Sequence, residues 1–279
     1  MKVLEIPNGR LGNGIFRYLA SVILQMEYGA ERIFNQRDAH NMSKVIISDD
    51  NYSELLRAIE NNRAIFNGVL IILNGYYQFN LYCEPNYKSK IVQFLKEHPS
   101  DIIYGTNLQH QLIQNRAEEL MNPPEDLRRY EIVIHVRLED FMTTNNMIHP
   151  NTVVDVINSI ASTYKDTRVP VAAIVCNKLT TDMEKQYIQY IYDNSKLHHV
   201  FESNDVITDF HIMKHARVLV CSLSTLSWCA ALLSETVHTV YVPKNKSNGH
   251  QTFSKPIENT ILYENVFCEK KDLTALFLA

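Results

Sequence analysis

Short apolar runs alternate with segments of helical periodicity along most of the chain. Runs rich in β-branched residues, which are typical of buried strands, lie at 2–6, 130–138, 171–176, 198–203, 217–222 and 238–243. Segments whose apolar residues recur every three or four positions, as in helices, lie at 14–30, 152–164, 181–194, 205–216 and 224–234. Because strands and helices alternate, we expect the strands to pair in parallel and the helices to pack on them.

This alternation predicts an α/β protein with Rossmann-like units, and the length of 279 residues suits either one large domain or two. The segment 101–130 has a helical character and ends in "NPPEDLRRY", where two prolines and a charge cluster indicate a boundary. We therefore predict domains at 1–129 and 130–279. The tail 270–279 is expected to form a short amphipathic helix that packs back on the body.

Composition and charge narrow the function. Hydrophobic residues make up 46% and charged residues 21%, as in ordinary globular proteins, and the net charge of −4 argues against broad binding to nucleic acid or to an anionic membrane. The longest apolar runs are too short to cross a bilayer. The N-terminus lacks the layout of a secretory signal, so we expect a cytoplasmic protein.

Cysteines and histidines give no clear metal or disulfide signal. The five cysteines are widely spaced and include no C-x-x-C pair, which favours buried thiols: Cys83, Cys176, Cys221, Cys229 and Cys268. The histidine pairs 198–199 and 211/215 have no third ligand near them in the sequence, so we predict no metal site.

Three glycines, Gly9, Gly12 and Gly14, follow the first predicted strand. A strand, a glycine-rich turn and a helix together can bind an anion through backbone N–H groups. The spacing G-x-x-G-x-G matches neither the dinucleotide fingerprint nor a P-loop, and a tight turn with positive φ angles explains it equally well. Arg10 and Asn13 favour binding, since both can donate hydrogen bonds to a phosphate or a sugar.

Polar side chains gather at the end of the strand 130–138, at His135, Arg137, Glu139 and Asp140. The carboxyl ends of parallel strands are where open α/β sheets bind ligands, so Arg137 is placed to bind a phosphate. The alternative is that Arg137 forms a structural ion pair with Asp140 or Glu139.

A hydroxyl cluster lies between the strand 217–222 and the next helix: Ser222, Ser224, Thr225 and Ser227. Hydroxyl and N–H groups at a helix start suit an N-cap or a bound phosphate. Capping needs one hydroxyl and four are present, which favours a phosphate.

Four segments follow one another along the chain: "GRLGN" at 9–13, "LNGYYQFNLY" at 73–82, "HVRLEDF" at 135–141 and "DFHIMKHARVLVCSLSTLSW" at 209–228. Together they resemble the α-1,2-fucosyltransferase family, that is, glycosyltransferase family 11. The compact chain without a signal also resembles the glycosyltransferases of large algal viruses that build their own glycans. The corresponding family motifs read G-x-L-G-N-Q-x-F-Q-Y, G-Y-x-Q, H-x-R-R-G-D-Y and D-x-x-x-M followed by N-S-T-F-S-W-W.

The resemblance implies a GT-B fold in which two Rossmann-like domains face a cleft, with the acceptor on the side of 1–129 and the donor on the side of 130–279. It implies inverting transfer of a sugar from a nucleotide sugar, GDP-fucose first of all, to a glycan hydroxyl, without a metal or other cofactor. The donor-binding residues carried over by the motifs are His135 and Asp209 for guanine, Arg137 for the β-phosphate, Ser224 and Thr225 for the diphosphate, and Arg10, Gly12 and Asn13 from the first loop.

In this scheme Arg137 stabilises the departing diphosphate, and Asp140 or Glu139 accepts the proton of the acceptor hydroxyl. Tyr76, Tyr77 and Gln78 offer aromatic faces and an amide to an acceptor sugar. The alternative for the tyrosines is packing between the domains.

The chain departs from the family pattern at three places, which leaves the donor open. Leu138 replaces a second arginine, 176–178 replaces an S-D-D stretch, and Leu223 replaces an asparagine. One alternative is transfer from another donor, such as UDP-xylose. The other is a non-catalytic protein of the same fold that binds a nucleotide or a glycan. A Rossmann-type oxidoreductase requires a dinucleotide fingerprint, which the spacing here does not supply.

Overall fold

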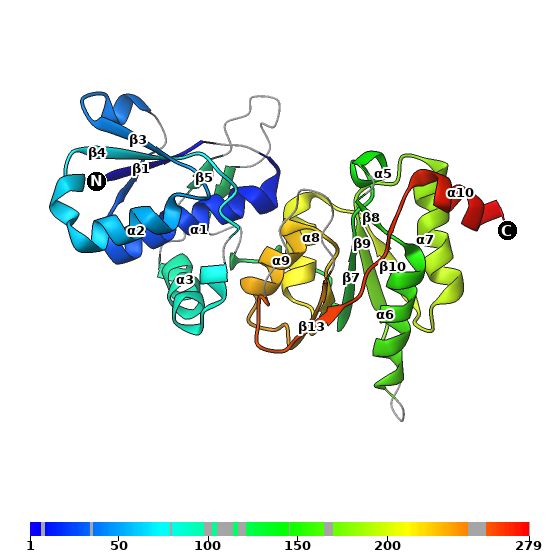
Figure 1. Ribbon diagram of the computed structural model, residues 1–279. Coiled ribbons are helices and arrows are strands. Elements are labelled where there is room, and N and C mark those ends of the chain that lie inside the picture. The colour runs from blue at the N-terminus through cyan, green and yellow to red at the C-terminus, as the bar shows by residue number, and fades with distance from the viewer. Residues whose placement is uncertain are drawn as a thin grey trace. The chain divides into compact units, whose positions relative to one another are not determined.

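The computed structural model describes residues 1–6, 9–33, 36–78, 80–97, 102–104, 114–116, 121–144, 146–164, 170–244 and 255–278. The chain divides into two compact units, Met1–Pro123 and Pro124–Ala279, so the division falls between the two adjacent prolines of the predicted boundary segment (Figure 1). Each unit is described by itself below.

The first unit is built on a parallel four-stranded sheet. Its strands have the order β2-β1-β4-β3 and are β1 (Lys2–Glu5), β2 (Glu31–Ile33), β3 (Ser43–Ile47) and β4 (Val69–Leu73). The helices are α1 (Leu11–Tyr28), α2 (Tyr52–Asn61) and α3 (Pro85–Glu97), with short 3-10 turns η1 (Gln36–Ala39), η2 (Arg63–Phe66) and η3 (Asn80–Cys83). β2 lies on one side of β1, whereas β4 and β3 lie on the other side of β1. The strand order therefore reverses between β1 and β4.

Local sequence explains the bounds of α1. It begins at Leu11, earlier than the predicted start at position 14, and it ends at Tyr28, followed by Gly29 with a left-handed φ of 60°. The N–H groups of Gly29 and Ala30 donate to the carbonyls of Gln25 and Leu24, the usual way to close a helix with glycine. Thirteen of its residues are buried, including every residue from 15 to 24, because α1 is covered on all sides by β1, β2, β5 (Ile102–Tyr104) and α3.

The second unit is built on a six-stranded sheet with the order β10-β9-β7-β11-β12-β13, in which every pairing is parallel. The strands are β7 (Ile132–Val136), β9 (Ala172–Cys176), β10 (His199–Glu202), β11 (Val218–Val220), β12 (Thr239–Pro243) and β13 (Thr260–Tyr263). In chain order this is the 3-2-1-4-5-6 arrangement of the Rossmann fold, and the order reverses between β7 and β11.

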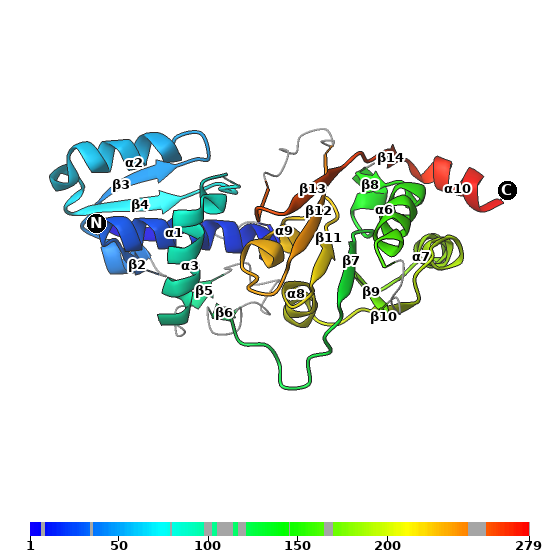
Figure 2. The same cartoon turned by 90° about the horizontal axis from the view of Figure 1, so that it is seen from below.

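Helices cover both faces of this sheet. Figures 1 and 2 show α6 (Pro150–Ser162) and α7 (Asp182–Asn194) on one face, and α8 (Val206–Lys214) and α9 (Thr225–Leu232) on the other. A short helix α5 (Phe141–Thr144) follows β7, and β8 (Met147–Ile148) pairs antiparallel with β14 (Phe267–Cys268). The last helix, α10 (Lys270–Leu278), packs on α7, where the rings of Tyr190 and Phe277 lie 6.0 Å apart.

These two parallel sheets confirm the predicted α/β class and its Rossmann-like units. The helical prediction for 101–130 is wrong at 102–104 and 114–116, because β5 (Ile102–Tyr104) and β6 (Gln114–Arg116) form an antiparallel pair there. The run "IIY" consists of β-branched and aromatic residues, which favour a strand over the weak helical pattern around it.

Candidate functional site

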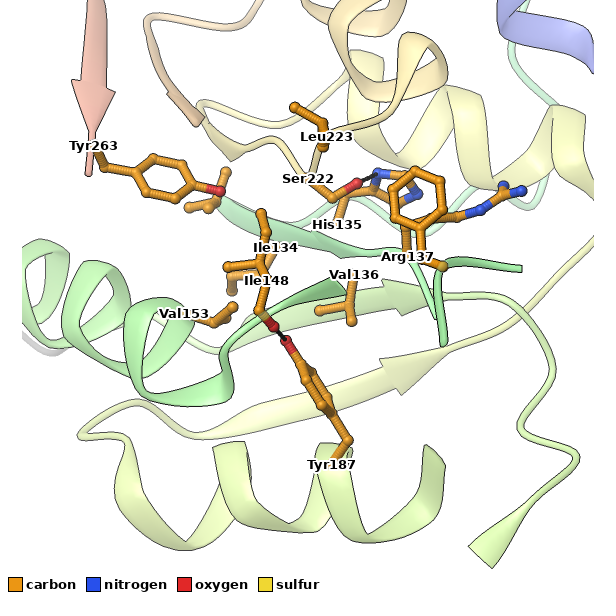
Figure 3. A pocket seen from close by; sticks show the side chains of 12 residues that line it. Ile134, His135, Val136, Arg137, Ile148, Val153, Tyr187, Ser222, Leu223 and Tyr263 are labelled. Atoms are coloured by element: carbon orange, nitrogen blue, oxygen red, sulfur yellow. Dashed lines mark hydrogen bonds between the residues drawn. The ribbon is translucent and has the colours of Figure 1, made fainter. Parts of the chain in front are cut away.

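The most distinctive group of side chains in the second unit lies where its strand order reverses. A pocket opens at the carboxyl ends of β7 and β11, and its lining is mostly apolar with three polar members, His135, Arg137 and Ser222 (Figure 3). Its other lining residues are Ile134, Val136, Phe141, Ile148, Val153, Tyr187, Val220, Leu223 and Tyr263. The reversal point is the position at which open α/β sheets leave a crevice for ligands.

His135 and Ser222 are joined across the two strands. Ser222 Oγ lies 2.9 Å from Nδ1 of His135, and both residues are buried. Burial lowers the pKa of His135 to about 4, so the imidazole is neutral at physiological pH. A neutral imidazole whose Nδ1 is engaged by a hydroxyl presents Nε2 as a single, fixed hydrogen-bonding atom.

The other hydroxyls of the cluster lie at the start of α9. Ser224 caps the helix, since its Oγ accepts from the N–H of Leu226 at 3.2 Å, and Ser227 Oγ donates to the carbonyl of Ser224 at 3.3 Å. Thr225 is the first residue of the helix and is partly exposed. The hydroxyl of Ser224 therefore caps the helix, that of Ser227 bonds to a carbonyl at the helix start, and that of Ser222 bonds to His135.

Arg137 leaves the end of β7 and forms the ion pair that the sequence offered as an alternative to phosphate binding. Its Nε and Nη2 donate to the same oxygen of Asp140, at 3.1 and 2.9 Å, and Glu139 lies 3.6 Å from Nη2. The guanidinium carbon lies 5.6 Å from the centre of the Phe141 ring. Since the pair is partly exposed to solvent, its net contribution to stability is small and a competing anion can displace the carboxylates.

Backbone strain accompanies this ion pair. Glu139 adopts a φ of 27°, in the left-handed range that favours glycine. Asn177 helps to fix the turn, because its Oδ1 accepts from the N–H of Leu138 at 3.3 Å. Strain of this kind is found mainly where a side chain must be held for function.

Asp209 is a buried carboxyl group on α8, outside the pocket. The backbone N–H and the side-chain amide of Asn204 both donate to its Oδ1, at 3.2 and 3.1 Å, and the same amide donates to Glu202. Burial raises the pKa of Asp209 to about 6, and Asp205 and Glu202 act in the same direction. This carboxyl group therefore changes charge close to physiological pH.

In the first unit, the predicted loop residues meet the predicted acceptor segment. Asn13 on the first turn of α1 accepts at Oδ1 from the amide of Gln78, at 3.3 Å. Gly9 has a φ of 75°, and a Cβ there would lie 2.6 Å from Nδ2 of Asn13, so only glycine fits beside this side chain. Gly12 and Gly14 lie inside the helix, and Arg10 is its exposed N-cap residue.

Tyr76 and Tyr77 point to different surroundings. Tyr76 is 42% exposed, while Tyr77 is fully buried in the core of the first unit, where its hydroxyl donates to the carbonyl of Ile47. The ring of Tyr77 contacts that of Tyr52 edge-on at 5.5 Å. Of the predicted acceptor residues, Tyr76 and Gln78 therefore lie at the surface of the unit and Tyr77 supports them from inside.

Other sequence features have structural roles. Four of the five cysteines are buried, Cys83 is half-buried and all five are free, and Trp228 is buried. Within the described residues, no group of three or more His, Cys, Asp or Glu side chains is placed to hold a metal ion. No helix in the described part of the chain is long and apolar enough to cross a membrane.

The sequence matches no protein-family model and no curated protein. Solved structures resemble the fold at low identity. A mutant of Arabidopsis thaliana FUT1 in complex with GDP is 12% identical, covers 86% of this chain and 69% of its own, and has a TM-score of 0.48. E. coli heptosyltransferase WaaC with ADP is 10% identical over 95% and 93% of the two chains, with a TM-score of 0.43. POFUT1 in complex with GDP is 10% identical over 85% and 96%, with a TM-score of 0.42.

Proposed function

We propose that the chain is a glycosyltransferase that moves a sugar from a nucleotide-sugar donor to a glycan hydroxyl. One observation carries this proposal: His135, Ser222 and the start of α9 converge at the strand reversal of the second unit, with Arg137 at its edge. A neutral hydrogen-bonding group, a cation and a helix N-terminus in one place suit a nucleotide diphosphate.

The chemistry follows from the charge that develops in the reaction. When the bond between the sugar and the β-phosphate breaks, the leaving diphosphate gains negative charge, and Arg137 together with the N–H groups at the start of α9 can stabilise it. Ser224 and Thr225 stand at that helix start and offer further donors. These groups serve the role that a metal ion has in other transferases, so we propose transfer without a metal, with inversion at the sugar carbon.

A carboxylate near Arg137 is suited to accept the proton of the acceptor hydroxyl. Asp140 is paired with Arg137 in this structure, and Glu139 lies beside the same guanidinium. When a diphosphate takes over the guanidinium, the carboxylate of Asp140 is released from its partner while remaining beside the reacting groups. We therefore prefer Asp140 to Glu139 as the general base.

The donor that we favour is GDP-fucose. Guanine presents two adjacent N–H donors on one edge, which match a carboxylate such as Asp209, and the neutral imidazole of His135 supplies one further hydrogen bond. Uracil presents one N–H between two carbonyls and suits a carboxylate less well. A UDP-linked sugar such as UDP-xylose is the alternative donor.

The first unit supplies the acceptor side in this proposal. Tyr76 and Gln78 offer a ring and an amide to a glycan, and Arg10, Gly12 and Asn13 face the donor from the start of α1.

The test is a nucleotide panel with two readouts. GDP, UDP, ADP and CMP are compared for their effect on the melting midpoint, and GDP-fucose and UDP-xylose for slow hydrolysis that releases nucleotide. We expect GDP to stabilise the protein most and GDP-fucose to be hydrolysed. If no nucleotide shifts the midpoint, the proposal is wrong. Stabilisation without hydrolysis or transfer to any glycan favours a non-catalytic binding protein instead.

A further inference from the structure

One peptide group in the first unit is held between two opposite charges. The carbonyl of Gly75 accepts from Nη1 of Arg17 at 3.5 Å, and the N–H of Tyr76, in the same peptide group, donates to Oδ2 of Asp49 at 3.2 Å. The next N–H, that of Tyr77, donates to the other oxygen of Asp49. A cation at the carbonyl and an anion at the N–H fix the plane of the Gly75–Tyr76 peptide.

This part of the chain is built around the contact. A Cβ on Gly75 would lie 2.7 Å from Oδ1 of Asp49, so glycine is required for the carboxylate to approach. Tyr77 adopts a φ of 53°, which is rare for a bulky residue and persists only where surrounding contacts enforce it. The residues on either side of Tyr77 are more accessible: Tyr76 is exposed and Gln78 is half-buried.

Arg17 is unusual because its side chain is charged and buried. The residue is 3% exposed, and desolvation by burial lowers the pKa of its guanidinium. Its neighbouring carboxylates have other partners. Glu5 pairs with Arg32 at 2.8 Å and accepts from Ser21, while Asp49 accepts two backbone N–H groups. Among the described residues, the carbonyl of Gly75 is the hydrogen-bond acceptor of this guanidinium, and burying a charge costs free energy of folding.

Arg17 and Asn13 stand four residues apart on α1 and therefore share one face of that helix. Asn13 binds Gln78 and Arg17 binds Gly75, so both ends of the segment 75–78 are held by this helix face.

We infer that Arg17 is the positioning residue of the acceptor site: through the Gly75–Tyr76 peptide it sets how the ring of Tyr76 and the amide of Gln78 meet a neutral sugar. This rests on the proposed function, because it assigns the glycan acceptor to this segment. Arg17 itself is too deeply buried to touch the sugar, so it acts through the loop.

The test compares two buried arginines of the same unit, in R17M and R32M. Methyl glycosides of galactose, glucose, mannose and N-acetylglucosamine serve as probes, with binding measured by saturation-transfer NMR and calorimetry. We expect R17M to weaken the best glycoside by about 10-fold or more while the melting midpoint stays within about 2 °C of wild type. R32M should lower the midpoint by several degrees, because Glu5 loses its cation, and leave the affinity for the glycoside unchanged.

In turnover, R17M should raise the KM for the acceptor and leave donor hydrolysis and the KM for the donor unchanged. R17K should restore acceptor binding in part, since it keeps the charge and loses the planar fork. The inference is overturned if R17M melts as low as R32M with unaltered glycoside affinity, or if wild type binds none of the glycosides. A failed nucleotide panel contradicts the proposed function alone, because the glycoside measurements need no nucleotide.

Discussion

Both units reverse their strand order beside the first strand, yet the two reversal points are equipped differently. In the second unit the strand ends carry an imidazole, hydroxyls and a guanidinium around a pocket. In the first unit the equivalent place, between β1 and β4, is occupied by the protein's own polar contacts, from Asn13 to Gln78 and from Arg17 to Gly75. One topology thus leaves a pocket with polar lining residues in one unit, and in the other it holds a surface segment by hydrogen bonds from a helix.

A residue with a strained backbone conformation lies beside the strand reversal in each unit. Tyr77 and Glu139 are the two residues other than glycine with positive φ in the described part of the chain, and each follows a strand next to the reversal. Tyr77 is held by the core and by Asp49, whereas Glu139 lies at the surface beside Arg137. The strain in the first unit is therefore locked by packing, while the strain in the second unit depends on a solvent-exposed turn.

The largest effect should come from Arg137. R137M removes the cation that we assign to the diphosphate, and we expect kcat/KM for the donor to fall by about 10²- to 10³-fold. Stability should change little, because the ion pair with Asp140 is partly exposed. K185M, which breaks an exposed pair of the same unit, serves as control and should keep full activity. Equal turnover in R137M and K185M would remove Arg137 from the chemistry.

The next effect concerns the contact between Ser222 and His135. S222A leaves the buried imidazole without its partner, so the free energy of unfolding should fall by about 1–3 kcal/mol and the affinity for the nucleotide by roughly 10-fold. T163A removes a hydroxyl of the same unit that bonds to a backbone carbonyl away from the pocket and should leave the affinity unchanged. Calorimetry of both variants with GDP checks this. An S222A protein that binds like T163A would contradict the role of the pair.

A third effect depends on pH, because two buried groups titrate in opposite senses. The pKa of His135 is lowered from 6.5 to about 4, so the unfolded chain binds the extra proton between these values and stability falls as the pH falls. The pKa of Asp209 is raised from 3.8 to about 6, so the folded chain binds the extra proton and stability rises as the pH falls. The two contributions oppose each other between pH 6 and pH 4.

In D209N the contribution of His135 is no longer offset. The stability of the variant should therefore fall more steeply than that of wild type between pH 6 and pH 4, by on the order of 2 kcal/mol over the interval. Denaturant unfolding at several pH values measures it. Parallel profiles for the two proteins would show that Asp209 does not titrate as described.

The smallest effect tests the strain at Glu139. E139G relieves the positive φ and should raise the free energy of unfolding by up to about 1 kcal/mol relative to E139A, which keeps the strain. Loss of the contact to Arg137 at 3.6 Å is common to both variants and cancels. If E139A is the more stable of the two by denaturant unfolding, the turn is not strained.

The alternation of apolar runs and helical periods predicted five of the six strands of the second sheet, and the central strands β7 and β9 are buried on both faces and read as continuous apolar stretches. It missed the edge strand β13, whose Ile261 and Leu262 are exposed. In the first unit it predicted β1 and missed β2, β4 and the edge strand β3, whose Val45 and Ile46 are exposed. The strands β5 and β6 were also missed, since the pairing of short antiparallel strands leaves little trace in the sequence.

The candidate site could be predicted from the sequence where its residues follow directly after a predicted strand. His135 and Arg137 follow from one run, and Ser224 and Thr225 from the start of the next helix. The pairing of His135 with Ser222 joins residues 87 positions apart, so only the parallel register of β7 and β11 brings them together. The role of Arg17 could not be predicted, because the sequence does not show that this residue of α1 contacts the carbonyl of Gly75, 58 positions away.

Hydrogen exchange with and without nucleotide tests the central claim most directly. With GDP, or with whichever nucleotide of the panel stabilises the chain most, we predict slower exchange in 132–141 and in 220–228, the two strand ends of the second unit and the start of α9. The amides of β2 and α2 in the first unit should not change. Protection that is absent from both segments of the second unit, while the nucleotide binds, would contradict the account.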